Sequence, residues 1–343
     1  MNFIHPAIIT NLNPAVNGPA ECPSLDSARA CHHNYSMHYT ELPEGHKSGF
    51  VALAGRPNVG KSTLLNRLMG QQIAAVSPRP QMTRQKQLGI LTLPEAQIIF
   101  MDTPGLHIPM HKLGEYMNAE AREALRDCDL ILMMFDLNYA PSKEDEQVVE
   151  IVMSLKEEAE LLATLNKVDL VDEAELPKRR DQFLMLIPDI PTITISATNG
   201  ENLDQLMEAI LERLPEGPRF YAKETITDTY ERDIAADMIR AAALEYLREE
   251  VPYSIAVRID TYTEREQHGA YIEATIFVER ESQKGIVIGQ GGKMLKRIGT
   301  WARQAIESAT GRKVYLRLRV KVLPGWRNDE NSLRKFGFSA EPE

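Results

Sequence analysis

Residues 55–62, with the sequence GRPNVGKS, constrain the fold of this chain more than any other stretch. They match G-x-x-x-x-G-K-[ST], the pattern of a phosphate-binding loop. The apolar run at 50–54 predicts a buried strand before the loop, and residues 63–69 predict a helix after it. This order brings backbone N–H groups and the positive end of a helix dipole to one point, where they can bind a phosphate. The alternative interpretation of the motif is a chance glycine turn before a helix. The expected phosphate ligands are Gly55, Arg56, Pro57, Asn58, Val59, Gly60, Lys61, Ser62 and Thr63.

A second motif, Asp102-Thr103-Pro104-Gly105, follows another predicted strand at 97–101. An aspartate there can hold Mg²⁺ through a water, and a glycine amide can contact a terminal phosphate. Taken alone, this sequence is a common turn. Thr83 lies in the preceding loop, where a switch threonine closes on Mg²⁺, although a lone threonine carries little signal. We expect Ser62, Thr83 and Asp102 to hold Mg²⁺, and Lys61, Thr83 and Gly105 to act in catalysis.

The segment Asn166-Lys167-Val168-Asp169 predicts which base is bound. The carboxylate of Asp169 can accept hydrogen bonds from N1–H and the 2-amino group of guanine, and adenine offers neither donor. Asn166 orients this loop and Lys167 covers the base. Ser196-Ala197 ends a later strand, where a backbone N–H can donate to guanine O6. The sequence therefore predicts GTP and GDP as ligands and GTP hydrolysis as the reaction.

The residue that orients the attacking water is less visible. Ras-like GTPases place a glutamine directly after Asp-x-x-Gly, but this chain has Leu106. We therefore expect slow intrinsic hydrolysis that needs backbone groups, a cation or a partner. Asn58 is a candidate ligand for K⁺ near the phosphates, and the alternative is that Asn58 only shapes the loop.

The length of 343 residues suggests two domains or slightly more, and the net charge of −10 would argue against nucleic-acid binding if it were spread evenly. Strands and helices alternate from about 48 to 214, which predicts a mostly parallel sheet in an α/β G domain at 47–215. A Pro-Gly-rich linker at 216–228 precedes a unit of order αββααβ at 229–327, and a tail at 328–343 follows. Three cysteines without a disulfide pattern favour a reducing cytoplasm.

Residues 1–46 are rich in Pro, Asn, Ser and His and predict a disordered extension. Met37 is a candidate for the biological start. Cys22 and Cys31 lie near two histidines, but their spacing matches no common zinc pattern, which favours thiols in a tail over a metal site.

A glycine loop at 289–292, GQGG, opens a predicted helix in the second unit. In a KH domain such a loop clamps the backbone of about four nucleotides. Between 281 and 327 the Lys and Arg residues outnumber the acidic residues, which are Glu281 and Glu307. This local excess of positive charge predicts a surface that binds a polyanion. Tyr315 and Trp326 are candidates for stacking on bases, with burial favoured for Tyr315. The expected RNA-binding residues are Lys284, Gly289, Gln290, Gly291, Gly292, Lys293, Lys296 and Arg297.

The chain resembles the Era GTPases over roughly 46–328. The resemblance rests on 55–62, 102–107, 166–169 and above all 285–299 followed by Ala302-Arg303. It implies a P-loop GTPase domain followed by an α+β type II KH domain that binds small-subunit (16S) rRNA near its 3′ end. Two positions depart from the family pattern. Gln290 stands where a basic residue is usual, and Met82 replaces the first of two threonines.

The motifs predict a GTP-hydrolysing switch, and the resemblance implies that it assists assembly of the 30S ribosomal subunit. We expect a monomer located in the cytoplasm, and the resemblance also implies a loose, peripheral association with the inner membrane. Two alternatives remain open at this stage. One is a membrane-associated cell-cycle signalling GTPase, and the other is an RNA-binding module with a vestigial nucleotide domain.

Overall fold

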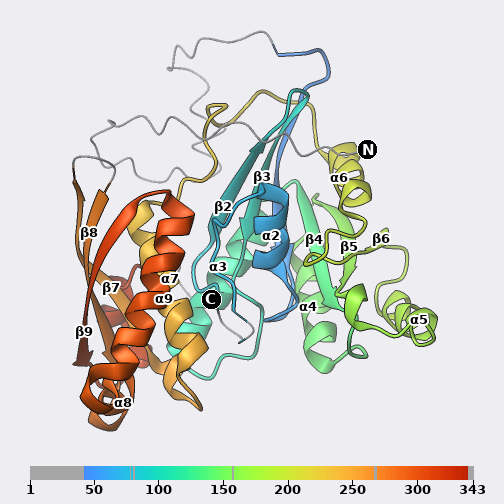
Figure 1. Cartoon of the computed structure of the whole chain (residues 1–343). Coiled ribbons are helices and arrows are strands. Elements are labelled where there is room, and N and C mark those ends of the chain that lie inside the picture. The colour runs from blue at the N-terminus through green and yellow to red at the C-terminus, as the bar shows by residue number, and fades with distance from the viewer. Residues whose placement is uncertain (1–41, 78, 80–81, 157, 266–268, 339–343) are drawn as a thin grey trace. The chain divides into compact units, whose positions relative to one another are not determined.

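The computed structural model describes residues 42–77, 79, 82–156, 158–265 and 269–338 (Figure 1). Most of the predicted extension, with Met37 and the two cysteines in it, therefore lies outside the described residues. All of the described residues belong to one compact unit. That unit contains a six-stranded sheet and, later in the chain, a three-stranded sheet.

The six-stranded sheet has the order β2-β3-β1-β4-β5-β6. Strands β3, β1, β4, β5 and β6 run parallel, and β2 pairs antiparallel to β3. Every residue of β3 and β4 is buried, because helices cover both faces of a parallel sheet. The strands are β1 (Lys47–Ala54), β2 (Gln87–Thr92), β3 (Ala96–Asp102), β4 (Leu130–Asp136), β5 (Glu160–Asn166) and β6 (Thr192–Thr194).

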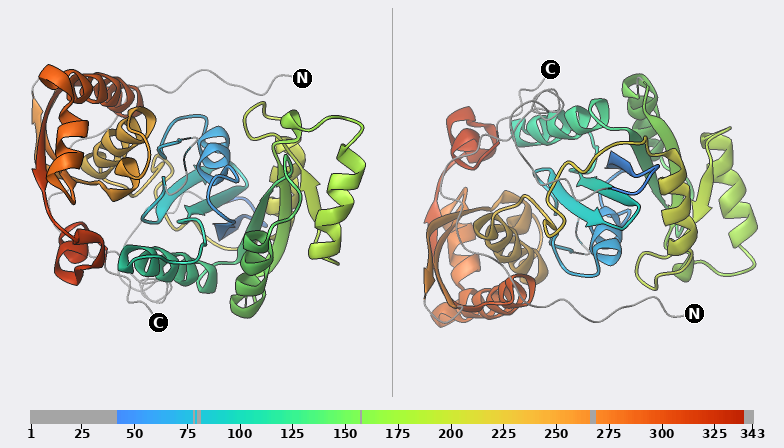
Figure 2. Two further views of the ribbon diagram at one scale, coloured as in Figure 1. Left: turned by 90° about the horizontal axis from the view of Figure 1, so that it is seen from below. Right: turned by 90° about the horizontal axis from the view of Figure 1, so that it is seen from above.

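Helices pack on both faces of this sheet (Figure 2). Leu64 of α2 and Leu206 of α6 share one apolar cluster with β1, β3 and β4. On the other face, Phe183 of α5 packs against Phe135 of β4 with ring centroids 5.4 Å apart. The helices are α2 (Lys61–Met69), α3 (Lys112–Arg126), α4 (Lys143–Leu155), α5 (Leu176–Leu186) and α6 (Leu203–Arg213).

The three-stranded sheet has the order β7-β8-β9, with an antiparallel β7/β8 pair and a parallel β8/β9 pair. Its inner face shares an apolar cluster with helices α7 and α9. The elements are α7 (Glu231–Tyr246), β7 (Ala256–Arg265), β8 (Gly269–Val278), α8 (Glu281–Ile288), α9 (Lys293–Thr310) and β9 (Lys313–Val322). The predicted fold class, an α/β G domain followed by an α+β KH domain, is confirmed.

Some elements and exposures differ from the prediction. The sequence patterns did not indicate β2, α5 or the short helix α10 (Glu330–Lys335). The two aromatic candidates are also reversed. Tyr315 is 62% exposed on β9, whereas Trp326 is fully buried and donates from Nε1 to the Ser254 carbonyl at 2.8 Å. The prediction that Tyr315 is the buried ring is therefore wrong, and Trp326 is not available to stack on a base.

Candidate nucleotide-binding site and RNA interface

The phosphate-binding loop connects β1 to α2 and is closed by Lys61. Its Nζ donates to the carbonyls of Gly55 and Arg56 at 3.0 and 3.2 Å, inside the loop. Desolvation lowers the pKa of Lys61 to about 8, an effect that Asp102 partly offsets. The loop therefore places a buried amino group beside the backbone that would cradle a phosphate.

The three residues predicted to hold Mg²⁺ lie together. The Ser62 and Thr83 hydroxyls are 3.0 Å apart, and both donate to Oδ2 of Asp102, at 2.6 and 2.9 Å. Asp102 is fully buried, and its Oδ1 has no hydrogen-bond partner among the described residues. Burial raises the pKa of Asp102, although Lys61 and the two hydroxyls counter the effect. A buried carboxylate with an unsatisfied oxygen beside two hydroxyls fits a hard divalent cation such as Mg²⁺.

The loop after Asp102 packs directly on the phosphate loop. A side-chain carbon added to Gly105 would lie 2.6 Å from the Pro57 nitrogen, so only glycine allows this approach. The Leu106 N–H donates to the Gly55 carbonyl at 3.3 Å, and the Leu106 side chain is buried. The position that carries a water-orienting glutamine in Ras-like GTPases is therefore apolar and turned into the core, which agrees with the expectation of slow intrinsic hydrolysis.

Helix α3, which follows this loop, places a carboxyl group against the backbone after Thr83. Glu120 accepts a hydrogen bond from the Lys86 N–H at 2.7 Å. Burial raises the pKa of Glu120 to about 7, and the contact with Lys86 limits the rise. The carboxyl group therefore titrates near neutral pH.

The raised pKa of Glu120 predicts that stability falls as the pH rises from about 4.5 to about 7, because the unfolded chain ionises this group first. Glu120→Gln keeps an acceptor for the Lys86 N–H and removes the ionisation. We expect the stability advantage of the variant over the wild type to grow by about 2–3 kcal/mol between pH 5 and pH 8, since one pKa unit equals about 1.4 kcal/mol. Urea unfolding at both pH values measures this gain. Glu123→Gln on the same helix is the control, and an equal gain in both variants would contradict the assignment.

One amide holds the predicted base-binding loop against its neighbours. Asn166 donates from Nδ2 to the Val59 carbonyl at 2.8 Å and accepts from the Ala197 N–H at 2.9 Å. Asp169 lies just beyond, exposed to solvent. The Ser196 N–H donates to the Glu201 carbonyl at 3.2 Å, so both N–H groups predicted to reach guanine O6 already have acceptors. A contact with O6 therefore requires one of these hydrogen bonds to be shared or opened.

Two acidic residues that the sequence analysis missed connect the phosphate loop with the base loop. Asp136 is buried at the end of β4; its Oδ2 lies 2.7 Å from Lys167 Nζ and 3.8 Å from Arg56 Nη2. Arg56 Nε also lies 3.1 Å from Asp145 on α4. Asp136 follows a buried apolar run in the same way as Asp102 and Asn166, and that position is the signal that could have found it.

Asn58 has a backbone φ of 67°, in the left-handed region. Asparagine tolerates this conformation better than most residues. The geometry therefore supports the alternative that Asn58 shapes the loop, and the K⁺ role stays a prediction.

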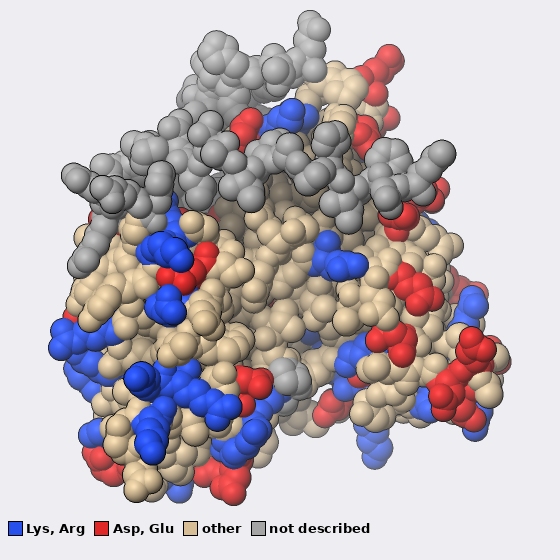
Figure 3. Space-filling view, viewed as in Figure 1, with Lys and Arg blue, Asp and Glu red and all other residues tan. Residues whose placement is uncertain are grey.

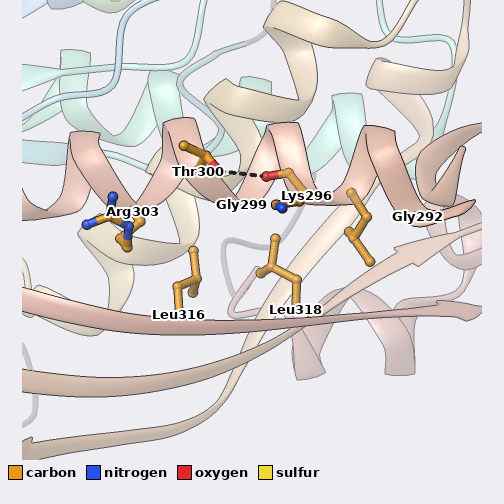
Figure 4. A pocket seen from close by; sticks show the side chains of 8 residues that line it. Gly292, Lys296, Gly299, Thr300, Arg303, Leu316 and Leu318 are labelled. Carbon is orange, nitrogen blue, oxygen red and sulfur yellow. Dashed lines mark hydrogen bonds between the residues drawn. The ribbon is translucent and has the colours of Figure 1, made fainter.

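The predicted RNA loop connects α8 to α9. Gly289, Gly291 and Gly292 all have positive φ, between 59° and 77°. A groove of about 390 Å³ lies beside the loop between α9 and β9 (Figure 4). The floor of the groove is apolar, and Lys296 lies at its rim. The lining residues are Gly292, Leu295, Lys296, Gly299, Thr300, Arg303, Leu316 and Leu318.

The groove includes Arg303, Thr300 and two β9 leucines that were not among the predicted RNA residues. Arg297, which was predicted, instead lies over the Tyr246 ring at 4.2 Å, on the α7 side of the helix. Lys284 lies 3.5 Å from Glu281. The helix period of α9 could have separated Lys296 and Arg303 from Arg297.

The linear run of basic residues does not form one patch. Figure 3 shows Lys and Arg gathered over α8 and α9. The cations of β9 alternate outward on the sheet, and Arg317 and Arg319 both pair with Glu273, at 3.0 and 3.3 Å. Arg312 pairs with Glu231 at 3.0 Å. Acids from outside the run therefore reduce its charge, and the excess is concentrated near the glycine loop.

A phosphate loop, an oxygen cluster suited to Mg²⁺ and a guanine-type loop, followed by a KH fold, define the class: a P-loop GTPase with an RNA-binding domain. Residues 50–167 match the family model described as 50S ribosome-binding GTPase, and residues 250–327 match a KH domain model. A crystal structure of Era with MgGDPNP and nucleotides 1506–1542 of 16S ribosomal RNA is 39% identical, with a TM-score of 0.81, over 86% of this chain and 99% of that one. A variant of Aquifex aeolicus Era bound to GDP and AlF4⁻ is also 39% identical, with a TM-score of 0.80, over 85% and 99% of the two chains.

The chain belongs to the Era family of GTPases. The predicted resemblance is thereby confirmed.

Proposed function

We propose that this chain is a GTP-hydrolysing switch that binds the 3′ end of 16S rRNA and assists assembly of the 30S subunit. The assembled cluster of Ser62, Thr83 and Asp102 carries the proposal, because it belongs to the same chain as an open glycine-loop groove. The cluster argues against a vestigial nucleotide domain. The nucleotide state would then set how tightly the groove holds RNA.

The similarities to known proteins support the small ribosomal subunit, rather than the large one, as the partner. The family model that names the 50S ribosome covers residues 50–167 alone. The Era structure that contains 16S ribosomal RNA is similar over 86% of this chain, including the region of the KH domain. Since the KH domain is the part expected to touch RNA, the longer likeness is the more relevant one.

Each predicted residue has a distinct role in this proposal. Lys61 would neutralise the β- and γ-phosphates, and Ser62, Thr83 and Asp102 would hold Mg²⁺. Bound Mg²⁺ neutralises charge that develops on the phosphate oxygens during transfer. Gly105 would offer its amide to the γ-phosphate, and Asp169 would select guanine. The phosphate loop 55–63, residues 102–105 and residues 166–169 with Ser196 and Ala197 would surround the nucleotide.

The test compares turnover of GTP and ATP by the full chain in Mg²⁺, with GTP hydrolysed in K⁺ and in Na⁺. We expect GTP to be hydrolysed at least about a thousandfold more efficiently than ATP, because an unpaired carboxylate faces adenine. A faster rate in K⁺ is expected if Asn58 helps to hold that ion. Equal rates in the two salts would remove the K⁺ role, and equal use of ATP would overturn the proposal.

The domain limits belong to this proposal: a G domain at 47–215, a linker at 216–228 and a KH domain at 229–327. We also propose a cytoplasmic monomer whose contact with the membrane is peripheral. Among the described residues, no helix combines the length and apolar character of a membrane span. Vesicles of anionic lipid added to the RNA-binding assay test the membrane alternative, which requires lipid and RNA to compete for the basic surface near α8 and α9.

A further inference from the structure

The segment 82–87, called here the switch segment, begins one residue before Thr83 and runs into β2. Met82 is only 7% exposed and belongs to the same apolar cluster as Ile234 and Met238 of α7. In both views of Figure 2 the chain between α2 and β2 lies beside helix α7. The residue before the switch threonine is therefore packed into the core of the KH domain.

Arg84, the residue after the switch threonine, is buried in the same domain. Its Nη1 donates to the Ile255 carbonyl at 2.7 Å and its Nη2 to the Tyr253 carbonyl at 3.1 Å. The guanidinium also lies 5.8 Å from the centre of the Trp326 ring. A buried guanidinium is costly unless its donors are satisfied. Because Nε of Arg84 has no hydrogen-bond partner among the described residues, the position of this side chain depends on the two carbonyls that accept from Nη1 and Nη2.

The remainder of the switch segment is held from three directions. Gln85 donates to the Phe336 carbonyl at 3.4 Å, near the C-terminal end of α10. The Lys86 N–H donates to Glu120 on α3. Gln87 donates to Asp237 on α7. Helix α3, helix α7 of the KH domain and the end of α10 therefore all contact the switch segment.

We propose that Met82 and Arg84 are positioning residues through which the KH domain holds Thr83 at the metal site, so that RNA and GTP each strengthen binding of the other. Adjacent Cα atoms are about 3.8 Å apart, so Thr83 cannot leave Ser62 and Asp102 without straining or releasing at least one anchor. This inference rests on the proposed function and names the residues that couple its two sites. Binding linkage then requires the coupling to be equal in both directions.

Met82 allows one anchor of the switch segment to be tested by itself. An apolar side chain suits the buried cluster, whereas a hydroxyl there would be buried among alanine, isoleucine and methionine side chains. Met82→Thr should therefore weaken the anchor without changing any predicted phosphate or metal ligand.

The experiment measures affinity for RNA with the sequence of nucleotides 1506–1542 of 16S rRNA, in GDP and in GDPNP, for wild type, Met82→Thr, Arg84→Lys and Arg84→Ala. We expect the wild type to bind RNA about 5- to 150-fold more tightly in GDPNP, the usual range for linked sites. In the three variants this ratio should fall toward one. Their GDP affinity should stay within about twofold of wild type, because GDP does not require Thr83.

Two further readouts separate positioning from general stability. Hydrogen exchange of the backbone N–H groups at 83–87 should become faster in the variants with GDPNP, and the gain in GDPNP affinity from Mg²⁺ should shrink. Arg258→Ala, which removes a guanidinium that pairs with Asp260 on the same sheet, and Met185→Thr, at an exposed position, are the matched controls.

The experiment separates a failure of the proposed switch from a failure of the roles given to Met82 and Arg84. A wild-type ratio of one would refute the proposed switch itself. A normal wild-type ratio that Arg84→Ala and Met82→Thr leave unchanged would overturn only the assignment of Met82 and Arg84. If Arg84→Ala does not fold, Arg84→Lys and Met82→Thr decide the matter, because the first keeps the charge and the second leaves Arg84 intact.

Discussion

Replacing Asp169 by asparagine is expected to lower the affinity for GTP by about a thousandfold, since the amide loses a charged acceptor and presents a donor to two guanine donors. The same variant should gain affinity for xanthosine triphosphate, whose base carries a carbonyl oxygen in place of the 2-amino group. Asp169 lies exposed at the open end of the site, so the substitution leaves the fold intact. Competition with a fluorescent guanine nucleotide measures both affinities.

Asp172→Asn provides the control, because it makes the same change in charge at an exposed position three residues further along the chain. It should bind GTP as the wild type does. If Asp169→Asn bound GTP normally, or if it lost GTP without gaining the xanthine nucleotide, the assignment of Asp169 to the base would be wrong.

The second large effect is expected in the glycine loop of the KH domain. The double variant Gly291→Asp/Gly292→Asp should lower RNA affinity by about a hundredfold, because like charges brought together cost several kcal/mol. An added side-chain carbon at either position meets no other atom within 4 Å, and aspartate tolerates the positive φ better than most residues. Filter binding of the 16S fragment measures the loss, and GTP turnover should be unchanged.

Gly311→Asp/Gly325→Asp is a closely matched control. Both glycines have positive φ, 67° and 64°, and open space around them, but they lie outside the glycine loop. The two double variants therefore carry the same change in charge and the same backbone strain. Equal loss of RNA affinity in both would show that overall charge, and not the loop, determines binding.

Much of the nucleotide site could be predicted from sequence because its residues occur at fixed spacing where buried strands end. Strands β3 and β4 are buried along their whole length, and the residues at which they end lie at one edge of the sheet. Asp136 meets the same criterion but belongs to no familiar motif, and it was missed. Residues with a regular position and an unfamiliar sequence are therefore the ones most easily overlooked.

Other features depended on contacts with distant parts of the chain. Helix α5 buries Phe183 alone, so its apolar period is weak, and β2 is a six-residue edge strand. The partners of Arg84 are about 170 residues away, and no local pattern indicates them. The exposure of Tyr315 had a signal in the sequence: it alternates in phase with Lys313 and Arg317, whereas Val314 faces the core.

The single amide of Asn166 has a consequence for protein engineering. It joins the loop after β1 to the loop after β6, and a carbon added to Gly60 would come within 2.3 Å of it. Three connections from separate strand–helix repeats are thus fitted around one side chain. Chimeras that import one of these connections from a related enzyme should lose nucleotide altogether, and only a transplant of all three as a set should retain it.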